Sequence, residues 1–289
     1  MNAKNYTIAG LGLRLHAPHF TFGGLAPFET RSRSNDPVPD IEVFPCARVA
    51  PDSSLGIIDT FDFPDSGAEC RLCGDGADYL FTLTPRNGSP SVHLLLPADG
   101  RSVSTDYKAG SDPALFRFGL WMACNIRAAA RSVLAVHSSA VVHNGAAVLF
   151  LGESGTGKST HTRLWLEHVP DTRLLNDDSP FVRAGETGAT AYGSPWSGKT
   201  PCYRNENYPI RAFVRLSQAP ANRIERLPTL RAYAALQPSF PPSFAHDERL
   251  FDLTNALISS LLSSTPVYHL ACLPDADAAR LAAKTLFGA

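Results

Sequence analysis

The 289-residue chain lacks an excess of charge of either sign and lacks any long hydrophobic run. With 26 basic and 27 acidic residues, it has no basic field for nucleic acid and no acidic regulatory tail. No apolar run is long enough to cross a bilayer, and the N-terminus, Met1 to Tyr6, has no apolar core of a signal peptide. These absences predict a cytoplasmic protein that binds neither nucleic acid nor a membrane.

Cysteine is too sparse for a disulfide scaffold. Six cysteines are scattered along the chain, and only Cys70 and Cys73 have the C-x-x-C spacing of metal or redox sites. Because no second pair completes a four-ligand zinc site, reduced thiols are expected, with a zinc or disulfide role as the alternative. The chain also has no H-E-x-x-H motif and no Ser-His-Asp or Cys-His nucleophile set, so neither zinc hydrolysis nor acyl transfer is indicated.

Residues 1–110 are predicted to form a β-rich region. Pro85 to Gly88 predicts a hairpin turn, and the polar stretch from Thr30 to Pro39 predicts a loop. No residues here have the spacing of a catalytic site, which leaves the role of the region open between substrate presentation and packing. Short apolar or alternating runs, typical of strands, cover 11–15, 56–58, 79–83 and 92–96.

Residues 111–289 are predicted to form an α/β domain. Asp112 followed by Pro113 marks the start of a helix that ends near Arg131. A turn at 143–145 and a proline-rich loop at 238–244 separate further elements. Strands are expected over 133–142, 146–151, 173–178, 210–216 and 267–273, and helices after residue 158, over 247–263 and over 275–287.

The motif around which this domain is organised fits G-x-x-x-x-G-K-[ST], the phosphate-binding loop. It follows an unbroken apolar run, which predicts a strand buried on both faces, and it precedes apolar residues at helical spacing. Glycines let successive backbone N–H groups face phosphate oxygens, and the following helix adds its positive end. An ordinary glycine turn would leave the Lys-Ser pair unexplained. The predicted phosphate-binding residues are Gly152, Glu153, Ser154, Gly155, Thr156, Gly157, Lys158, Ser159 and Thr160.

Two consecutive acids, Asp177 and Asp178, end a predicted strand, where ligand sites of α/β sheets lie. Lys158 is expected to reach the β- and γ-phosphates of ATP, and the Ser159 hydroxyl to hold Mg²⁺ together with the acids. Because neighbouring residues on a strand point to opposite sides, one carboxylate serves the metal while the other, assigned to Asp178, accepts a proton from a hydroxyl. The two roles are not separated by sequence alone, and a surface turn or helix cap at Asp-Asp-Ser-Pro is the alternative.

Three other charged or titratable residues are candidates. A neutral imidazole at His137 can contact a phosphate or a second divalent ion, although a histidine in an apolar strand is often purely structural. Lys199 lies in a second glycine-rich loop, at 191–200, and Arg204 follows it. Either cation can supply positive charge to a transferring phosphoryl group, and a solvated loop cation is the alternative.

The order of these motifs resembles the catalytic core of the HPr kinase/phosphorylase and phosphoenolpyruvate carboxykinase superfamily. The resemblance covers roughly residues 130–216 and implies a P-loop core of mixed sheet and helices. It implies ATP and Mg²⁺ contacts by Lys158 and Ser159, metal-associated and proton-accepting roles for Asp177 and Asp178, and a phosphate or metal contact by His137. HPr kinase phosphorylates a serine of a small carrier protein, and relatives of its core phosphorylate free serine or seryl groups of peptides. The matching stretches are 137–140, 152–160, 177–178 and 193–199.

The chain also departs from that superfamily. It is too short for the large N-terminal domain of the carboxykinase, and it has no counterpart of the oxaloacetate-binding arginines or of the phosphorylase loop. We therefore expect an ATP-dependent phosphotransferase that acts on a hydroxyl of a seryl peptide, a protein or a small molecule. A carboxykinase-type enzyme, an NTPase switch and a nucleotide-gated binding module are the alternatives.

Overall fold

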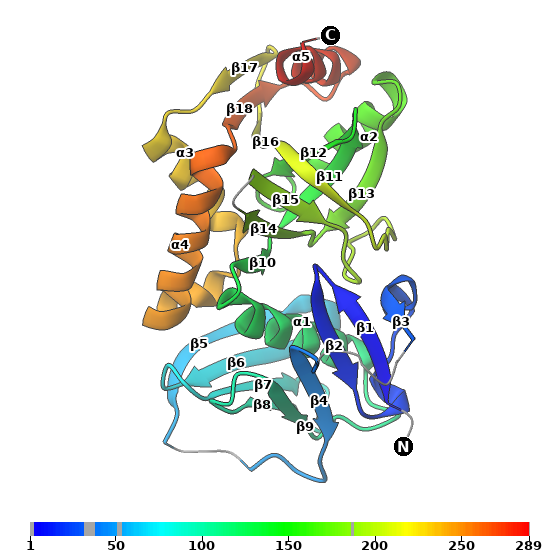
Figure 1. Cartoon of the computed structure of the whole chain (residues 1–289), viewed down its shortest axis with the longest axis vertical. Helices are drawn as coiled ribbons and strands as arrows, with labels where there is room; N and C mark the ends of the chain where they lie inside the picture. Colours follow the sequence, from blue (N-terminus) through cyan, green and yellow to red (C-terminus); the bar gives the residue numbers. More distant parts are fainter. Residues whose placement is uncertain (1–2, 32–37, 51–53, 186–187, 289) are drawn as a thin grey trace. The chain divides into compact units, whose positions relative to one another are not determined.

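In the computed structural model, which describes residues 3–31, 38–50, 54–185 and 188–288, the chain divides into two units. The first contains Met1–Arg131 and Ser243–Leu253, and the second contains Ser132–Pro242 and Thr254–Ala289. Among the described residues each unit contains one nine-stranded sheet together with helices, so the chain is a mixed α/β protein (Figure 1). The sequence analysis placed residues 111–131 in the second domain, whereas their contacts group them with the first unit.

The sheet of the first unit contains every strand that the sequence analysis expected there, and Pro85 to Gly88 lies at the turn between two of them. The strand pairs β2–β4 and β4–β9 are parallel and the other neighbours are antiparallel. In spatial order the strands are β3 (Glu29–Thr30), β1 (Lys4–Ile8), β2 (Leu11–Leu15), β4 (Ile41–Pro45), β9 (Ser102–Thr105), β8 (Val92–Leu96), β7 (Tyr79–Pro85), β6 (Ala68–Gly74) and β5 (Gly56–Phe63).

Helix α1 (Pro113–Ala129) begins at the predicted residue. The Asp112 side chain accepts the N–H of Ala114 at 2.9 Å, and Pro113 occupies the first turn, where its missing N–H costs nothing. The helix packs against β7 and β8, which explains why it belongs to the first unit. Its buried Arg127 donates to the carbonyls of Pro97 and Ser102, both at 2.7 Å. The short 3₁₀ helices of this unit are η1 (Pro18–Phe20), η2 (Gly23–Phe28) and η3 (Pro64–Ser66).

The C-x-x-C pair does not form a shared site. Cys70 and Cys73 are three positions apart on β6, so their side chains point to opposite faces of the sheet. Cys70 is buried, and burial raises the pKa of its thiol to about 12. All six cysteines are free thiols in this structure.

The sheet of the second unit brings four strand ends to one edge. Strands β12, β16 and β18 are parallel neighbours, so their carboxyl ends meet. Strand β11 is antiparallel to both β12 and β13, and β13 therefore ends at the same edge as β12. The strands are β10 (Val133–Ala135), β14 (Phe181–Gly185), β15 (Gly188–Tyr192), β16 (Asn207–Gln218), β12 (Ala146–Leu151), β11 (Ser138–His143) and β13 (Arg173–Asp178) in spatial order, with β18 (Val267–Cys272) beside β16 and β17 (Arg223–Arg226) beside β18.

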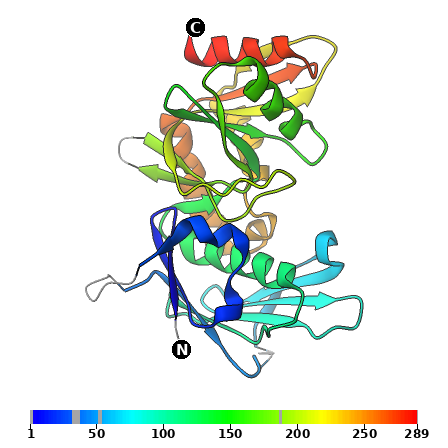
Figure 2. The same ribbon diagram turned by 90° about the vertical axis from the view of Figure 1, so that its right-hand side faces the viewer.

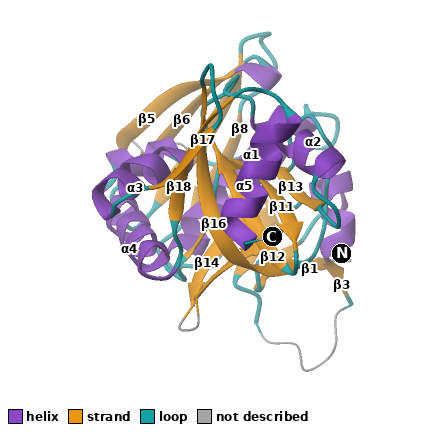
Figure 3. Cartoon of the chain, turned by 90° about the horizontal axis from the view of Figure 1, so that it is seen from above, coloured by secondary structure: helices purple, strands orange, loops and turns teal. Residues whose placement is uncertain are grey.

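Helices α2 (Lys158–His168) and α5 (Ala276–Phe287) lie side by side on one face of this sheet, where α5 is red and α2 green in Figure 2. Trp165 of α2, Phe150 of β12 and Leu286 of α5 belong to the same buried cluster. Helix α3 (Thr229–Leu236) packs against β16 and β18 (Figure 3). The remaining helices are η4 (Gln237–Ser239) and η5 (Pro242–His246), which lie in or next to the predicted proline-rich loop, and α4 (Glu248–Ser264). No helix in the described part of the chain is both long and apolar enough to cross a membrane.

Candidate functional site

The segment that joins β12 to α2 is the predicted glycine loop. Gly157 has a φ of 106°, a conformation that strains any residue with a Cβ, and α2 begins immediately after it at Lys158. No side chain of the described residues caps this helix start. The N–H groups of the first turn therefore remain available to an anion, and the helix dipole adds partial positive charge at the same place.

Lys158 folds back over this loop. Its ammonium group donates to the carbonyl oxygens of Gly152 at 2.6 Å and of Glu153 at 3.2 Å. Burial lowers the pKa of Lys158, and the positive charge of Arg215 lowers it further, while the charges of Asp178 and Asp177 oppose the shift. The lysine is thus a half-buried cation whose hydrogen-bond partners, among the described residues, are two neutral carbonyls, and this favours the approach of an anion.

Asp177 is the buried member of the acidic pair, with only 5% of its surface exposed. One carboxylate oxygen accepts from the Ser139 hydroxyl, which lies directly opposite on β11. The other accepts the N–H of Thr200 at 3.3 Å. These two bonds fix the carboxylate in one orientation.

Asp177 and Ser159 line one hollow of about 400 Å³, which we call the helix hollow. A carboxylate and a hydroxyl are hard oxygen ligands of the kind that Mg²⁺ prefers, so these residues fit the predicted ion. Within the described ranges no cluster of three or more His, Cys, Asp or Glu side chains is arranged to hold a metal. Mg²⁺ held by one or two protein side chains commonly takes its other ligands from phosphate and water.

Asp178 differs from its neighbour in backbone and environment. Its φ is 147°, a region that residues other than glycine rarely occupy and that costs on the order of 1–3 kcal/mol. Its side chain is 43% exposed; one oxygen accepts from the Ser179 hydroxyl at 2.9 Å, and the other lies 3.9 Å from Nε2 of His137. Backbone strain at an exposed carboxylate is typical of functional sites.

His137 reaches the site because the expected strand over 133–142 is broken. The backbone N–H of Val136 donates to the carbonyl of Pro180, and that of His137 donates to the carbonyl of Ser239. His137 therefore lies in the gap between the end of β10 and the start of β11. Partial burial lowers the pKa of His137, and the charges of Lys158 and Arg215 lower it further, against the opposing effect of Asp178. The imidazole is therefore neutral at pH 7.

The second glycine-rich loop, at 191–200, is hydrogen-bonded to the end of β13, which carries Asp177 and Asp178. Ser197 forms an isolated β-bridge with Asp178, and the N–H of Gly198 donates to the carbonyl of Asp177. A Cβ on Gly198 would lie 2.8 Å from that oxygen, so only glycine permits this approach. The loop cations do not share this contact: Lys199 is exposed and does not line the helix hollow, and Arg204 lies 3.8 Å from Glu206.

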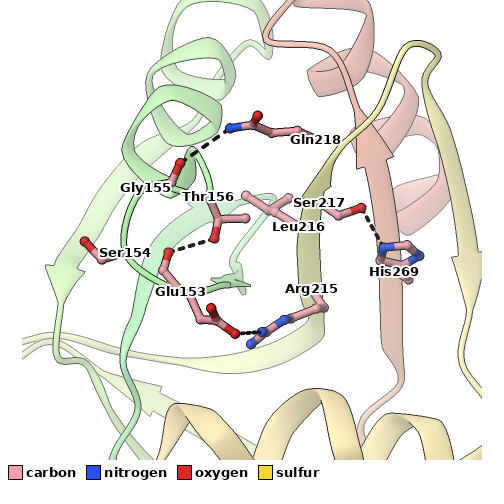
Figure 4. A pocket seen from close by; sticks show the side chains of 9 residues that line it. All are labelled: Glu153, Ser154, Gly155, Thr156, Arg215, Leu216, Ser217, Gln218 and His269. Carbon is pink, nitrogen blue, oxygen red and sulfur yellow. Dashed lines mark hydrogen bonds and ion pairs between the residues drawn. The ribbon is translucent and has the colours of Figure 1, made fainter.

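Several residues of this edge were missed by the sequence analysis. Ser139 and Thr200 hold Asp177, and a second hollow beside the loop is lined by side chains of β16 and β18, including Arg215 and His269 (Figure 4). Ser139 was within a quoted motif, but its bond depends on the pairing of β11 with β13. Pairing registers between distant strands leave no local signal in one sequence.

Comparison with known proteins assigns no family to this site. No family model matches the chain, and no curated protein matches it. A functional interpretation therefore has to depend on the geometry and chemistry described above.

Proposed function

We propose that this protein is an ATP-dependent phosphotransferase that moves the γ-phosphoryl group of ATP to a hydroxyl group. One observation carries the proposal: Lys158, at the start of an uncapped helix, and Asp178, with its strained backbone, both lie where β12 and β13 end, at the same edge of the sheet. A cation for phosphate oxygens and a carboxylate for a hydroxyl proton are the two groups that phosphoryl transfer to an alcohol requires.

In the proposed step, the acceptor oxygen bonds to the γ-phosphorus while the bond from that phosphorus to the β–γ bridging oxygen breaks, and ADP leaves. The hydroxyl proton passes to the Asp178 carboxylate, which acts as the general base. The loop amides and Lys158 bind phosphate oxygens, and neutral His137 orients Asp178. Mg²⁺, when bound, neutralises phosphate charge.

We assign the two acids to different roles on the basis of burial. Asp177 is held by Ser139 and Thr200 and shares the helix hollow with Ser159, which suits a metal ligand. Asp178 is exposed and its outer oxygen has no partner closer than 3.9 Å in the described contacts, which suits a base that must meet a substrate. The phosphate-binding loop, the acidic pair and the second loop also support our assignment of the core to the HPr kinase and carboxykinase type.

Calorimetric titration of the full-length protein with ATP in the presence of Mg²⁺ tests the phosphate site. We expect binding heat for the wild type and none for Lys158→Ala, because the variant lacks the cation at the loop. Lys108→Ala, which removes an exposed lysine from the first unit, is the matched control and should bind like the wild type. Absence of heat with the wild-type protein would contradict the proposal.

A further inference from the structure

No cation of the second glycine-rich loop enters the proposed step, yet the backbone of this loop is held closely to the acidic strand. Asn176, the residue before Asp177 on β13, is fully buried and takes part in this attachment. Its amide group donates to the carbonyl oxygens of Trp196 at 2.9 Å and of Cys202 at 3.3 Å. The asparagine therefore joins the strand to the loop and to the chain just beyond it.

The same side chain also forms a hydrogen bond on the far side of Asp178. Its Oδ1 accepts the backbone N–H of Ser179 at 2.9 Å. Ser194 of the second loop is fully buried as well, and its hydroxyl donates to the carbonyl of Ser179 at 2.6 Å and lies 3.3 Å from Nδ2 of Asn176. Asp178 thus lies between two residues that are bonded to the same loop, an arrangement that we call the Asn176 clamp.

The Asn176 clamp explains how Asp178 keeps its strained backbone. A φ of 147° is unfavourable for a residue with a Cβ and persists only where the surrounding contacts over-determine it. The two bonds to Ser179 fix the chain after Asp178, and the N–H of Gly198, which donates to the carbonyl of Asp177, fixes the chain before it. Each of these hydrogen bonds offsets part of the strain.

We propose that Asn176 is a positioning residue for Asp178, and that the Asn176 clamp holds the base carboxylate where the acceptor hydroxyl meets it. This inference rests on the proposed function, because it requires Asp178 to act as the base. In the described contacts the side-chain bonds of Asn176 go to residues 179 and 194–202, and Asn176 does not line the helix hollow. Its loss should therefore lower the rate of transfer and leave the affinity for ATP unchanged.

Asn176→Asp tests the clamp because the two side chains have nearly the same shape. The carboxylate keeps an acceptor for the N–H of Ser179, but it replaces the amide donor with an oxygen that faces the carbonyls of Trp196 and Cys202. At about pH 8 we expect phosphoryl transfer at saturating ATP to fall by about 10²-fold, the effect of misplacing a catalytic group by about 1 Å. Calorimetric titration should give the same ATP affinity as the wild type.

The rate of this variant should also depend on pH in a way that a structural role does not explain. Burial raises the pKa of a carboxylic acid, and the protonated acid again carries a donor for the loop carbonyls. When the pH is lowered from about 8 to about 6, transfer by Asn176→Asp should therefore recover relative to the wild type at the same pH. A role in stability alone would change the folded fraction and not the rate per folded molecule.

Asn125→Asp is the matched control. Asn125 is equally buried, and its amide donates to the carbonyl of Trp121 at 2.9 Å in the first unit. Both variants should unfold at lower urea concentration, but only Asn176→Asp should lose transfer rate per folded molecule. Ser194→Ala, which removes the bond to the Ser179 carbonyl and retains Asn176, decides the matter if Asn176→Asp does not fold. It should lower the rate by about tenfold at unchanged ATP affinity, the equivalent of one lost hydrogen bond.

The outcomes separate this inference from the proposed function. Transfer by the wild type with an unchanged rate in the folded variants would overturn the clamp and leave Asp178 in its proposed role. A rate of Asn176→Asp that does not recover at lower pH, or an equal loss of rate in Asn125→Asp, would also overturn it. Absence of transfer by the wild type would contradict the proposed function and this inference together.

Discussion

Charged side chains in the two units differ in how fully they are paired by hydrogen bonds. In the first unit Asp106 accepts both the backbone N–H and the ring Nδ1 of His93, at 2.8 and 2.9 Å, and buried Arg127 donates to two carbonyls. At the strand edge of the second unit, Asp178 has a strained backbone and lies 3.9 Å from His137. Among the described residues, the ammonium group of Lys158 forms its hydrogen bonds with two carbonyls of its own loop. The first set of charges is paired within the fold, whereas we propose that the second set binds a ligand.

The pKa shifts follow the same division. Burial alone would raise the pKa of Asp106, but the hydrogen bonds from His93 outweigh it and lower that pKa. Burial and neighbouring positive charge lower the pKa of Lys158 and of His137. The protein thus stabilises a charge in the first unit and destabilises two charges in the second. An anion bound at the loop would relieve that destabilisation, because it favours the charged form of both groups.

The largest expected effect separates Asp178 from Asp106. Asp178→Asn should keep ATP affinity and lose phosphoryl transfer by a factor of about 10²–10⁴, the usual contribution of a positioned base. Asp106→Asn should lower the free energy of unfolding and leave the transfer rate of the folded protein unchanged. Transfer rates at saturating ATP, with unfolding measured in urea, check both. A full-rate Asp178→Asn variant would remove this residue from the proposed role.

A smaller effect concerns His161, in the packed part of α2 beneath the site. Its Nε2 accepts from Trp165 at 3.0 Å, Nδ1 has no hydrogen-bond partner among the described residues, and burial lowers its pKa from 6.5 to about 4. Between pH 4 and 6.5, His161 is protonated in the unfolded chain but stays neutral in the folded chain. The free energy of unfolding should therefore fall by about 3 kcal/mol as pH decreases from 6.5 to 4. Above pH 6.5 His161 is neutral in both states, and this loss of stability is absent.

His161→Gln tests this assignment, because glutamine retains an acceptor for Trp165 but does not titrate. Urea unfolding at several pH values should show a shallower decline for the variant than for the wild type. Identical pH dependence in the two proteins would place the titrating group elsewhere.

Two adjacent serines test the support of Asp177. Ser139→Ala removes the hydroxyl that donates to this carboxylate, whereas the Ser138 hydroxyl donates to the carbonyl of Val136 at 3.2 Å. Loss of such a supporting bond weakens metal affinity by about tenfold or more. We expect the magnesium concentration for half-maximal activity to rise for Ser139→Ala and to stay unchanged for Ser138→Ala. The same rise in both variants would refute a specific role for Ser139.

The smallest expected effect is a shift of the His137 titration. A bound triphosphate favours imidazolium, so ATP should raise the pKa of His137 from its lowered value in the free protein. Nuclear magnetic resonance of the histidine ring protons, with and without ATP, measures the shift. His93 in the first unit is the internal control, and a nucleotide-independent titration of His137 would place it outside the site.

Local signals made several features of both units predictable. The loop motif, the strand over 146–151 and the cap at Asp112 depend on residues close together in sequence, and the structure contains each of them. The strand that ends at Asp178 was also expected, and the structure contains it as β13. The roles of these residues in catalysis stay predictions.

The features that were not predicted from the sequence depend mainly on pairing between strands that are distant in the chain. The break at His137 arises because β10 pairs with β14 while β11 pairs with β12 and β13. The second hollow, beside the phosphate-binding loop, requires Arg215 to lie next to both Leu151 and His269, and one sequence does not reveal this register between three strands. Strands β14, β15 and β17 have short, weakly apolar sequences and were missed for that reason.

Transfer of label from γ-labelled ATP tests the central claim most directly. The wild-type protein would be incubated with free serine, seryl peptides and lysate proteins, beside Asp178→Asn at the same ATP occupancy. Our account predicts label on a hydroxyl acceptor with the wild type and its loss with the variant. Hydrolysis of ATP at one rate whatever acceptor is offered, with no label on any of them, would contradict it.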